Sequence, residues 1–242
     1  MIDYLKYRFK NLLNNNKKRL GEIHIAQSKT NYNEIKNIRD AEIKIFSQFG
    51  EDGIINFLLH KLNFKNNISF VEIGTGDYEE ANTRFLCETM ISRGLLIDKI
   101  HELKFIEKRD FFWKNEIYYC QKSITSKNIN NILEQYGFIN NFNLLSIDVD
   151  GNDYWILEKI DISNCDIVIA EYNPIFGFGI NLHYLNLTGN TDNTYIDAKR
   201  FPAVGVEIFH LDPKGFNLYG ISRKKVSSHL GNGCGRLFCQ NE

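Results

Sequence analysis

The stretch Ser69-Phe70-Val71-Glu72-Ile73-Gly74-Thr75-Gly76-Asp77 decides the fold. Its first half is a short, largely apolar run of the kind found in strands buried on both faces, and the glycines after it allow a tight turn. Similar runs follow at Gly94–Asp98, Glu116–Cys120, Leu144–Asp148 and Asp166–Ala170, and stretches with helical periodicity lie between most of them. Strands that alternate with helices predict βαβ units around a parallel sheet.

The rest of the chain fits one α/β domain with an addition at the N-terminus. We expect a mostly parallel, seven-stranded sheet with helices on both faces, in which the runs Phe216–Ile221 and Arg236–Cys239 form a closing hairpin. The domain is expected to occupy residues 46–242, and a helical extension is expected over residues 1–45.

The extension begins with apolar residues at helical spacing and basic residues between them. The apolar positions are Ile2, Leu5, Phe9, Leu12 and Leu13. Such an amphipathic helix either docks on a membrane surface or a partner, or is an arm that lies on its own domain or on a second subunit. We favour the arm, because the apolar face is short. A homo-oligomer would then form through this helix.

Composition excludes several classes of function. The 242 residues carry 29 Lys and Arg against 30 Asp and Glu, so the basic surplus typical of nucleic-acid-binding proteins is missing. No apolar run approaches the roughly 18 residues that a transmembrane helix needs. The five cysteines are scattered and form no CxxC pair, which favours reduced thiols in a cytoplasmic protein.

Ligands of an open parallel sheet bind outside the carboxyl ends of its strands, so the residues there are the informative ones. After the first strand, Gly74 and Gly76 match the first two glycines of the dinucleotide fingerprint Gly-x-Gly-x-x-Gly, but Glu79 stands where the third glycine is required. The acids Glu72, Asp77, Glu79 and Glu80 would repel a phosphate but suit a cationic ligand. Asp98 ends the second strand, where it either binds the two hydroxyls of a ribose or caps a helix.

Polar groups gather again after the fourth and fifth strands. We expect Asp148, Asp150, Glu171 and Asn173 to converge over one pocket. Carboxylates held this close either bind a divalent cation, or one of them acts as the general base on a substrate hydroxyl. The long segment 176–200 is expected to cap the substrate, with Tyr195 in contact with it and His183 either a base or a surface residue.

These motifs together resemble a family. The segment 70–76 resembles the first motif of class I S-adenosylmethionine-dependent methyltransferases, and Asp98 matches the ribose-binding acid of that family. The segment 144–157 is similar to the fourth-strand motif of FkbM-like methyltransferases, Ile-Asp-x-Glu-Gly-x-Glu, although Asp150 and Asp153 stand where the family has Glu. The resemblance covers residues 46–173, just over half of the chain.

The resemblance implies an S-adenosylmethionine cofactor and assigns roles to particular residues. The predicted cofactor contacts are Gln48, Glu72, Gly74, Thr75, Gly76, Asp98, Ser123, Ile124 and Asp148. Gln48 is assigned through the turn 47–53, which has a second interpretation as a helix start capped by Ser47 or Asp52. The predicted catalytic residues are Asp150 and His183, the predicted substrate contacts are Glu171, Asn173 and Tyr195, and a divalent metal, if present, would use Asp148, Glu171 and Asn173.

The sequence thus predicts a methyltransferase that O-methylates a small polar, sugar or phosphorylated acceptor, in surface-polysaccharide synthesis. Two alternatives remain open. Asp148-Val149-Asp150 is also an Asp-x-Asp pattern of the kind that binds Mn²⁺ in glycosyltransferases. The chain could also be a non-catalytic module of the same fold that binds a partner.

Overall fold

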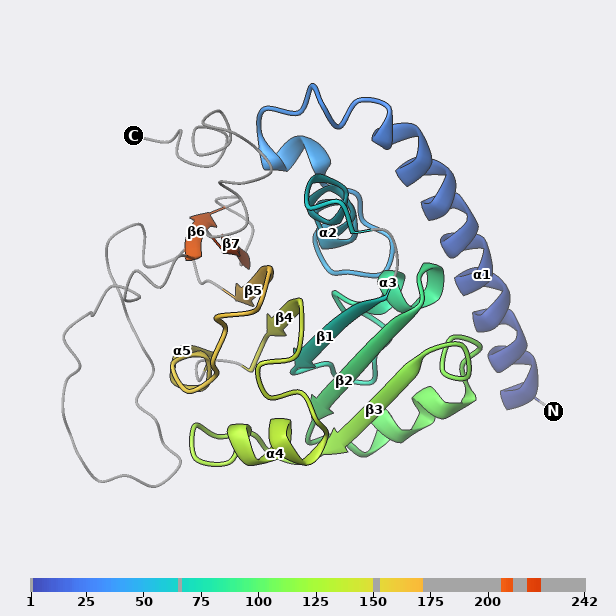
Figure 1. Ribbon diagram of the computed structural model, residues 1–242. Helices are drawn as coiled ribbons and strands as arrows, with labels where there is room; N and C mark the ends of the chain where they lie inside the picture. Colours follow the sequence, from blue (N-terminus) through green and yellow to red (C-terminus); the bar gives the residue numbers. More distant parts are fainter. Residues whose placement is uncertain (1, 65–66, 150–152, 172–205, 211–216, 223–242) are drawn as a thin grey trace.

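The computed structural model describes residues 2–64, 67–149, 153–171, 206–210 and 217–222, and shows a central sheet flanked by helices (Figure 1). The strands of the sheet follow the order β3-β2-β1-β4-β5-β7-β6. Their bounds are β1 (Ile68–Ile73), β2 (Ser92–Asp98), β3 (Glu116–Gln121), β4 (Leu144–Ile147), β5 (Ile167–Glu171), β6 (Val206–His210) and β7 (Asn217–Ser222). β1 to β5 are parallel, which confirms the prediction of a parallel α/β sheet.

The last two strands differ from the expected closing hairpin. β7 coincides with the predicted run at 216–221, and it pairs antiparallel with β5 on one side and with β6 on the other. β6 lies in a stretch for which no strand was predicted. The run at 236–239, which was expected to pair with 216–221, lies outside the described residues.

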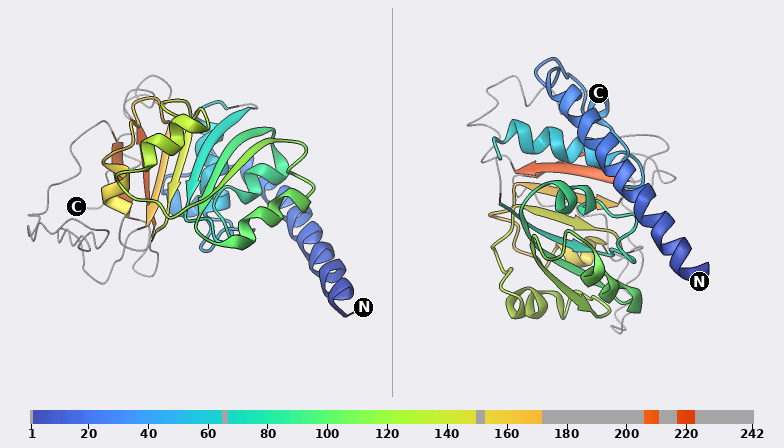
Figure 2. Two further views of the ribbon diagram at one scale, coloured as in Figure 1. Left: turned by 90° about the horizontal axis from the view of Figure 1, so that it is seen from below. Right: turned by 90° about the vertical axis from the view of Figure 1, so that its right-hand side faces the viewer.

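Helices lie on both faces of the sheet (Figure 2). Their bounds are α1 (Ile2–Lys29), η1 (Ile38–Ala41), α2 (Glu51–Lys61), α3 (Arg84–Thr89), η2 (His101–Lys108), α4 (Ile129–Gln135) and α5 (Asp153–Leu157), where η marks a 3₁₀ helix. Side chains alternate along each strand, so that in β1 Phe70 packs with α2, α3 and η2 on one face, whereas Val71 and Ile73 pack with α4 and α5 on the other. Both faces are buried, which explains the uninterrupted apolar runs.

The long helix α1 runs along one flank of the domain (Figures 1 and 2). Ile25 is buried in a small cluster with Ile43, Ile45, Phe46 and Phe85. Gly21 makes the close crossing possible, because a Cβ atom there would stand 2.6 Å from Cδ1 of Ile45. No described helix is long and apolar enough to span a membrane.

The chain between η1 and α2 is fixed by one buried carboxylate. Oδ2 of Asp52 accepts hydrogen bonds from the backbone N–H groups of Ile45, Phe46 and Ser47, at 2.6–2.8 Å, and from the Ser47 hydroxyl at 2.8 Å. The Ser47 Oγ in turn accepts from the backbone N–H of Asp52 at 3.1 Å. The second interpretation of the turn 47–53, a helix start capped by Ser47 or Asp52, is not what forms: the N-cap of α2 is Gly50, without a side-chain cap hydrogen bond, and the Ser47–Asp52 pair instead holds the turn that precedes it.

The substitution Asp52→Ala tests how much this turn contributes to stability. It leaves three buried N–H groups without an acceptor, so we expect the free energy of unfolding to fall by about 3–5 kcal/mol. Urea unfolding followed by circular dichroism measures the change. The control Asp40→Ala removes an exposed carboxylate and should stay within about 0.5 kcal/mol; equal effects of the two substitutions would contradict the assignment.

Candidate functional site

The carboxyl ends of β1, β2 and β4 lie side by side at one edge of the sheet. Ile73 of β1 is in register with Ile97 of β2 and with Ile147 of β4. The residues that follow these three strands therefore meet at this edge: the glycine loop Gly74–Gly76, Asp98 and Asp148. The backbone ladder continues one residue beyond the strands, since Gly74 N–H donates to Ile97 O at 2.8 Å and Asp148 N–H donates to Ile73 O at 2.9 Å.

The two glycines of the loop differ in what surrounds them. Gly74 has φ +84°, and a Cβ atom there would stand 1.5 Å from the carbonyl oxygen of Asp148, so only glycine fits. Gly76 has φ +56°, and nothing lies within 4 Å of the place where its Cβ would be. The first glycine is thus required by packing of the strand ends, and the second presents open backbone. Thr75, between them, is buried.

Asp98 holds the loop after β1 against the end of β2. Its Oδ2 accepts from Gly76 N–H at 2.8 Å, and its Oδ1 accepts from Ile100 N–H at 3.0 Å. The carboxylate is partly exposed, and each of its oxygens can accept a further hydrogen bond. The structure thus brings Asp98 to the glycine loop, as the sequence predicted, while one oxygen also has the local turn contact expected of a capping residue.

Glu72 points away from the open part of the edge. It is buried on the face that carries α3, where Oε1 accepts from Asn82 N–H at 2.8 Å and Oε2 accepts from Thr83 N–H at 3.0 Å and from the Thr83 hydroxyl. Burial raises the pKa of Glu72 to about 7, although the hydrogen bonds from Thr83 and Asn82 oppose this shift. Both carboxylate oxygens are engaged inside the protein, so a contact with a cofactor stays a prediction.

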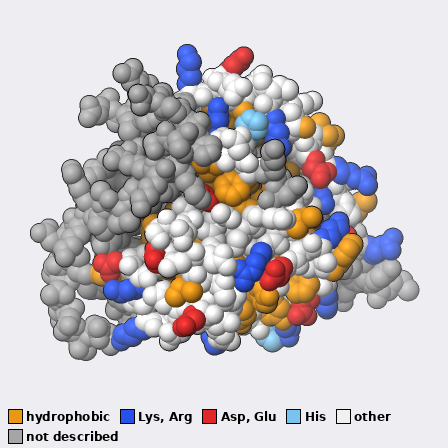
Figure 3. All heavy atoms as spheres, in the orientation of Figure 1, with side chains coloured by type: hydrophobic (Ala, Val, Ile, Leu, Met, Phe, Trp, Pro, Cys, Tyr) orange, Lys and Arg blue, Asp and Glu red, His pale blue; other side chains and the backbone are white. Residues whose placement is uncertain are grey.

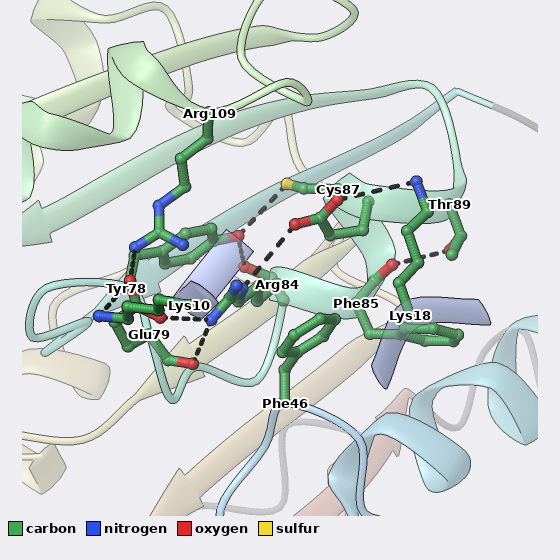
Figure 4. Close-up of polar contacts among 12 residues, drawn as sticks. Lys10, Lys18, Phe46, Tyr78, Glu79, Arg84, Phe85, Cys87, Thr89 and Arg109 are labelled. Carbon is green, nitrogen blue, oxygen red and sulfur yellow. Dashed lines mark hydrogen bonds and ion pairs between the residues drawn. The ribbon is translucent and has the colours of Figure 1, made fainter. Parts of the chain in front are cut away.

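A buried polar network continues from Glu72 through Thr83 to Tyr78 and Cys87, the last two of which are labelled in Figure 4. The Tyr78 hydroxyl lies 2.7 Å from Oγ1 of Thr83 and donates to Sγ of Cys87 at 3.3 Å. Burial raises the pKa of the Cys87 thiol to about 12, so this thiol is neutral and unreactive. No sequence pattern predicts this network, because its members are spread through a loop and a short helix. Tyr78, at φ +60°, carries no sequence signal for that backbone conformation.

Glu79 binds three cations from three parts of the chain (Figure 4). Its carboxylate pairs with Lys10 of α1 at 3.0 Å, with the buried Arg84 of α3 at 3.0 Å, and with Arg109, which follows η2. Burial alone would raise the pKa of Glu79, but Lys10, Arg109 and Arg84 outweigh it and lower the pKa to about 2. Next to this cluster lies a hollow of about 400 Å³, whose lining includes Asn11 of α1 and residues of η2. The sequence placed Glu79 where the dinucleotide fingerprint fails and among the acids that suit a cationic ligand, whereas in the structure it pairs with three cations of the chain itself.

Three other predicted cofactor contacts lie in exposed or half-buried loops. Gln48 is exposed in the turn held by Asp52. Ser123 is exposed and Ile124 is half-buried in the loop after β3, where Asn128 donates to the Ser123 carbonyl at 3.0 Å. The structure therefore leaves these side chains accessible but shows no contact that specifies a role for them.

The remaining predicted residues follow β4 and β5. Asp148 is exposed at the end of β4, and the next residue, Val149, donates its N–H to Oδ1 of Asp153 at 3.0 Å. Glu171 ends β5, and only its backbone is described. The other predicted residues, which lie outside the described residues, are Asp150, Asn173, His183 and Tyr195. Within the described part of the chain no group of three acids, histidines or cysteines could hold a metal ion.

Comparison with protein families shows which family the chain belongs to. Residues 54–194, more than half of the chain, match the model of the methyltransferase FkbM domain. The chain belongs to this family of S-adenosylmethionine-dependent methyltransferases, as the sequence motifs predicted. No curated protein matches the chain significantly.

Among solved structures, a cyclopropane-fatty-acyl-phospholipid synthase-like protein from Lactobacillus casei ATCC 334 is similar at 12% identity. The similar region covers 59% of this chain and 57% of that protein, with a TM-score of 0.31. The chain thus spans less than two thirds of that protein, and the family assignment depends on the sequence match.

The two glycines give a paired test of the loop geometry. We expect Gly74→Ala to lower the free energy of unfolding by about 3–5 kcal/mol, because the added methyl group collides with backbone and the positive φ is strained. Gly76→Ala meets only the strain, about 1–2 kcal/mol. Chemical denaturation of both variants measures the difference, and equal losses would show that the strand ends can move apart.

Glu72 predicts a pH dependence of stability. The folded protein keeps the proton on Glu72 up to about pH 7, whereas the unfolded chain releases it near the ordinary value of 4.5. The free energy of unfolding therefore falls as the pH rises from 4.5 to 7, by about 3 kcal/mol over the whole range.

Unfolding titrations from pH 4.5 to pH 7 should show this fall, and Glu72→Gln should remove it. Glu79→Gln is the matched control. The lowered pKa of Glu79 stabilises the fold above pH 4.5 and is lost only as the pH falls from 4.5 towards 2, so this variant should keep the fall above pH 4.5. A fall that persists in Glu72→Gln would assign it to another group.

Proposed function

We propose that the chain is an S-adenosylmethionine-dependent O-methyltransferase that modifies a small polar acceptor, a sugar or a phosphorylated molecule, in the synthesis of a surface polysaccharide. One observation carries the proposal beyond the family match. The open backbone of Gly76 lies beside Asp98 at the carboxyl edge of a parallel sheet, with a hydrogen bond of 2.8 Å between them. A small backbone surface next to an acid suits a ligand that carries both a cationic centre and ribose hydroxyls.

The described residues fit such a cofactor. Gly74, Thr75 and Gly76 would lie along its methionine portion, and Asp98 would accept hydrogen bonds from the ribose hydroxyls with its remaining acceptor capacity. Ser123 and Ile124 would border the adenine, and Gln48 would bind the methionine carboxylate. Glu72 would serve the cofactor indirectly, by holding Asn82 and Thr83 behind the loop.

The acceptor side of the proposal comes from the residues after β4 and β5. The cofactor supplies a methyl group on a sulfonium, and transfer needs an oxygen nucleophile held in line and relieved of its proton. We propose that Asp150 or His183 removes the proton from the acceptor oxygen, and that Glu171, Asn173 and Tyr195 position the acceptor. The proposal also includes a seven-stranded catalytic domain over residues 46–242, preceded by the helical extension over residues 1–45.

Calorimetric titration of the full chain with S-adenosylmethionine and with S-adenosylhomocysteine tests the proposal. We expect both to bind, and Asp98→Ala to weaken both by about 1.5–3 kcal/mol, because hydrogen bonds to a charged group are lost. Asp40→Ala, an exposed acid in η1, should bind as the unchanged chain does.

A second titration and an assay of methyl transfer separate the methyltransferase from the two alternatives, a glycosyltransferase and a non-catalytic module. Heat from a nucleotide sugar with Mn²⁺, and none from S-adenosylmethionine, would replace the proposal with a glycosyltransferase that uses Asp148 and Asp150. Binding of S-adenosylmethionine without methyl transfer to any member of a panel of sugars and phosphorylated acceptors would leave a non-catalytic module.

A further inference from the structure

The helix α1 presents six apolar side chains to solvent, on the side opposite the domain. Leu5, Phe9, Leu12, Leu13, Leu20 and Ile23 are between 51% and 68% exposed. Steps of three or four positions relate most of these residues, so they form one stripe along the helix. We call these six residues the apolar stripe.

The opposite side of α1 attaches the helix to the domain. Gly21 and Ile25 pack on the segment 43–46, Lys18 pairs with Glu88 at 3.7 Å, and Lys10 pairs with Glu79 at 3.0 Å. At 100° per residue, the positions of Gly21 and Ile25 are about half a turn from those of the stripe. The contacts of α1 with the domain therefore hold the stripe outward, where it meets no described part of the chain that would bury it.

The helix is also strongly cationic. Its 28 residues contain seven Lys and Arg against two acids, a net charge of +5, whereas the whole chain has a net charge of −1. Between Tyr4 and Gly21 there are six cations and no acid. Arg8 and Arg19 flank the stripe on one side. Lys17 follows it on the other side, with its ammonium group 5.5 Å from the centre of the Phe46 ring. Basic and apolar side chains lie side by side on this flank of the molecule (Figure 3).

A second patch of the same character lies next to α1. Phe105 of η2 is 46% exposed, and the ammonium groups of Lys104 and Lys108 lie 5.4 and 4.8 Å from the centre of its ring. Phe105 and Lys108 line the same hollow as Lys10 and Asn11, so this patch borders the side of α1 that faces the domain.

We propose that α1 binds the surface of an anionic phospholipid bilayer, with the apolar stripe inserted among the acyl chains and the flanking cations on the headgroups. A helix that is apolar on one side, cationic along the borders of that side and low in acids has the features of interfacial helices. The charge decides against a second copy of the chain as the occupant. Paired helices set oppositely charged residues at the positions beside their apolar seam, and here those positions carry cations or uncharged residues.

Sedimentation of the full chain with vesicles tests the proposal. We expect the chain to sediment with vesicles of phosphatidylglycerol and not with vesicles of phosphatidylcholine, and to be released by high salt, because the headgroup contacts are screened. Equal sedimentation with both lipids, or none with either, would overturn the proposal.

Variants at exposed positions separate the two contributions. Phe9→Asn combined with Leu12→Asn should weaken binding to phosphatidylglycerol vesicles by at least about tenfold, because two inserted side chains are lost. Arg19→Gln should weaken it about fivefold, the effect of one headgroup contact. The matched control Ile139→Asn changes an exposed apolar residue between α4 and β4, and should bind as the unchanged chain does.

Two outcomes would contradict the assignment of the stripe. The first is unchanged vesicle binding in the Phe9 and Leu12 double variant, with circular dichroism confirming that α1 is retained. The second is a dimer of the full chain in analytical ultracentrifugation that dissociates in the double variant, since this would make the stripe an interface between copies. Neither outcome bears on cofactor binding, which is measured separately.

Discussion

A side-chain carbon on Gly74 would stand 1.5 Å from the carbonyl oxygen of Asp148, and this close crossing of two backbones shapes the whole carboxyl edge. β1 is the central strand of the parallel part, and it carries hydrogen bonds to β2 and to β4 up to and beyond its last residue. The chain must then turn sharply over the edge. The turn brings the N–H of Gly76 to Asp98, so the packing of β1 against β4 determines where the acid after β2 finds its partner.

The loop that leaves this edge is held at two further points by carboxylates in opposite environments. Glu72 is buried among neutral donors, so its proton is retained to about pH 7. Glu79 is surrounded by three cations, so its charge persists down to about pH 2. The first carboxylate fixes the start of α3 from within the sheet, and the second fixes the same loop to α1 and to the segment after η2. The glycine loop can therefore be open at Gly76 while hydrogen bonds and ion pairs fix the segment that follows it.

Much of this arrangement could be predicted from the sequence. The buried parallel strands leave continuous apolar runs, and the residues that end those runs, Gly74, Gly76 and Asp98, meet because parallel strands end at one edge. The side chain of Glu72 points towards α3 rather than towards the open edge, and this could not be predicted in the same way. It depends on the alternation that places Glu72 on the face of Phe70 and on the donors of Asn82 and Thr83, ten and eleven residues away. Helix periodicity likewise located an apolar face on α1, but it could not show that Gly21 and Ile25 make the docking contact and leave that face outward.

The contacts of residues 25–45 have a consequence for how the protein can be divided. Ile25 shares a cluster with Phe46 and Phe85, and Tyr32, Ile38 and Ala41 belong to the main core beneath the sheet. A recombinant fragment that started at residue 46 would uncover the rings of Phe46 and Phe85. It would also remove Lys10, which pairs with Glu79, the counter-ion of the buried Arg84. Residues 1–45 and the part of the chain that follows them are therefore best expressed, crystallised and redesigned as one unit.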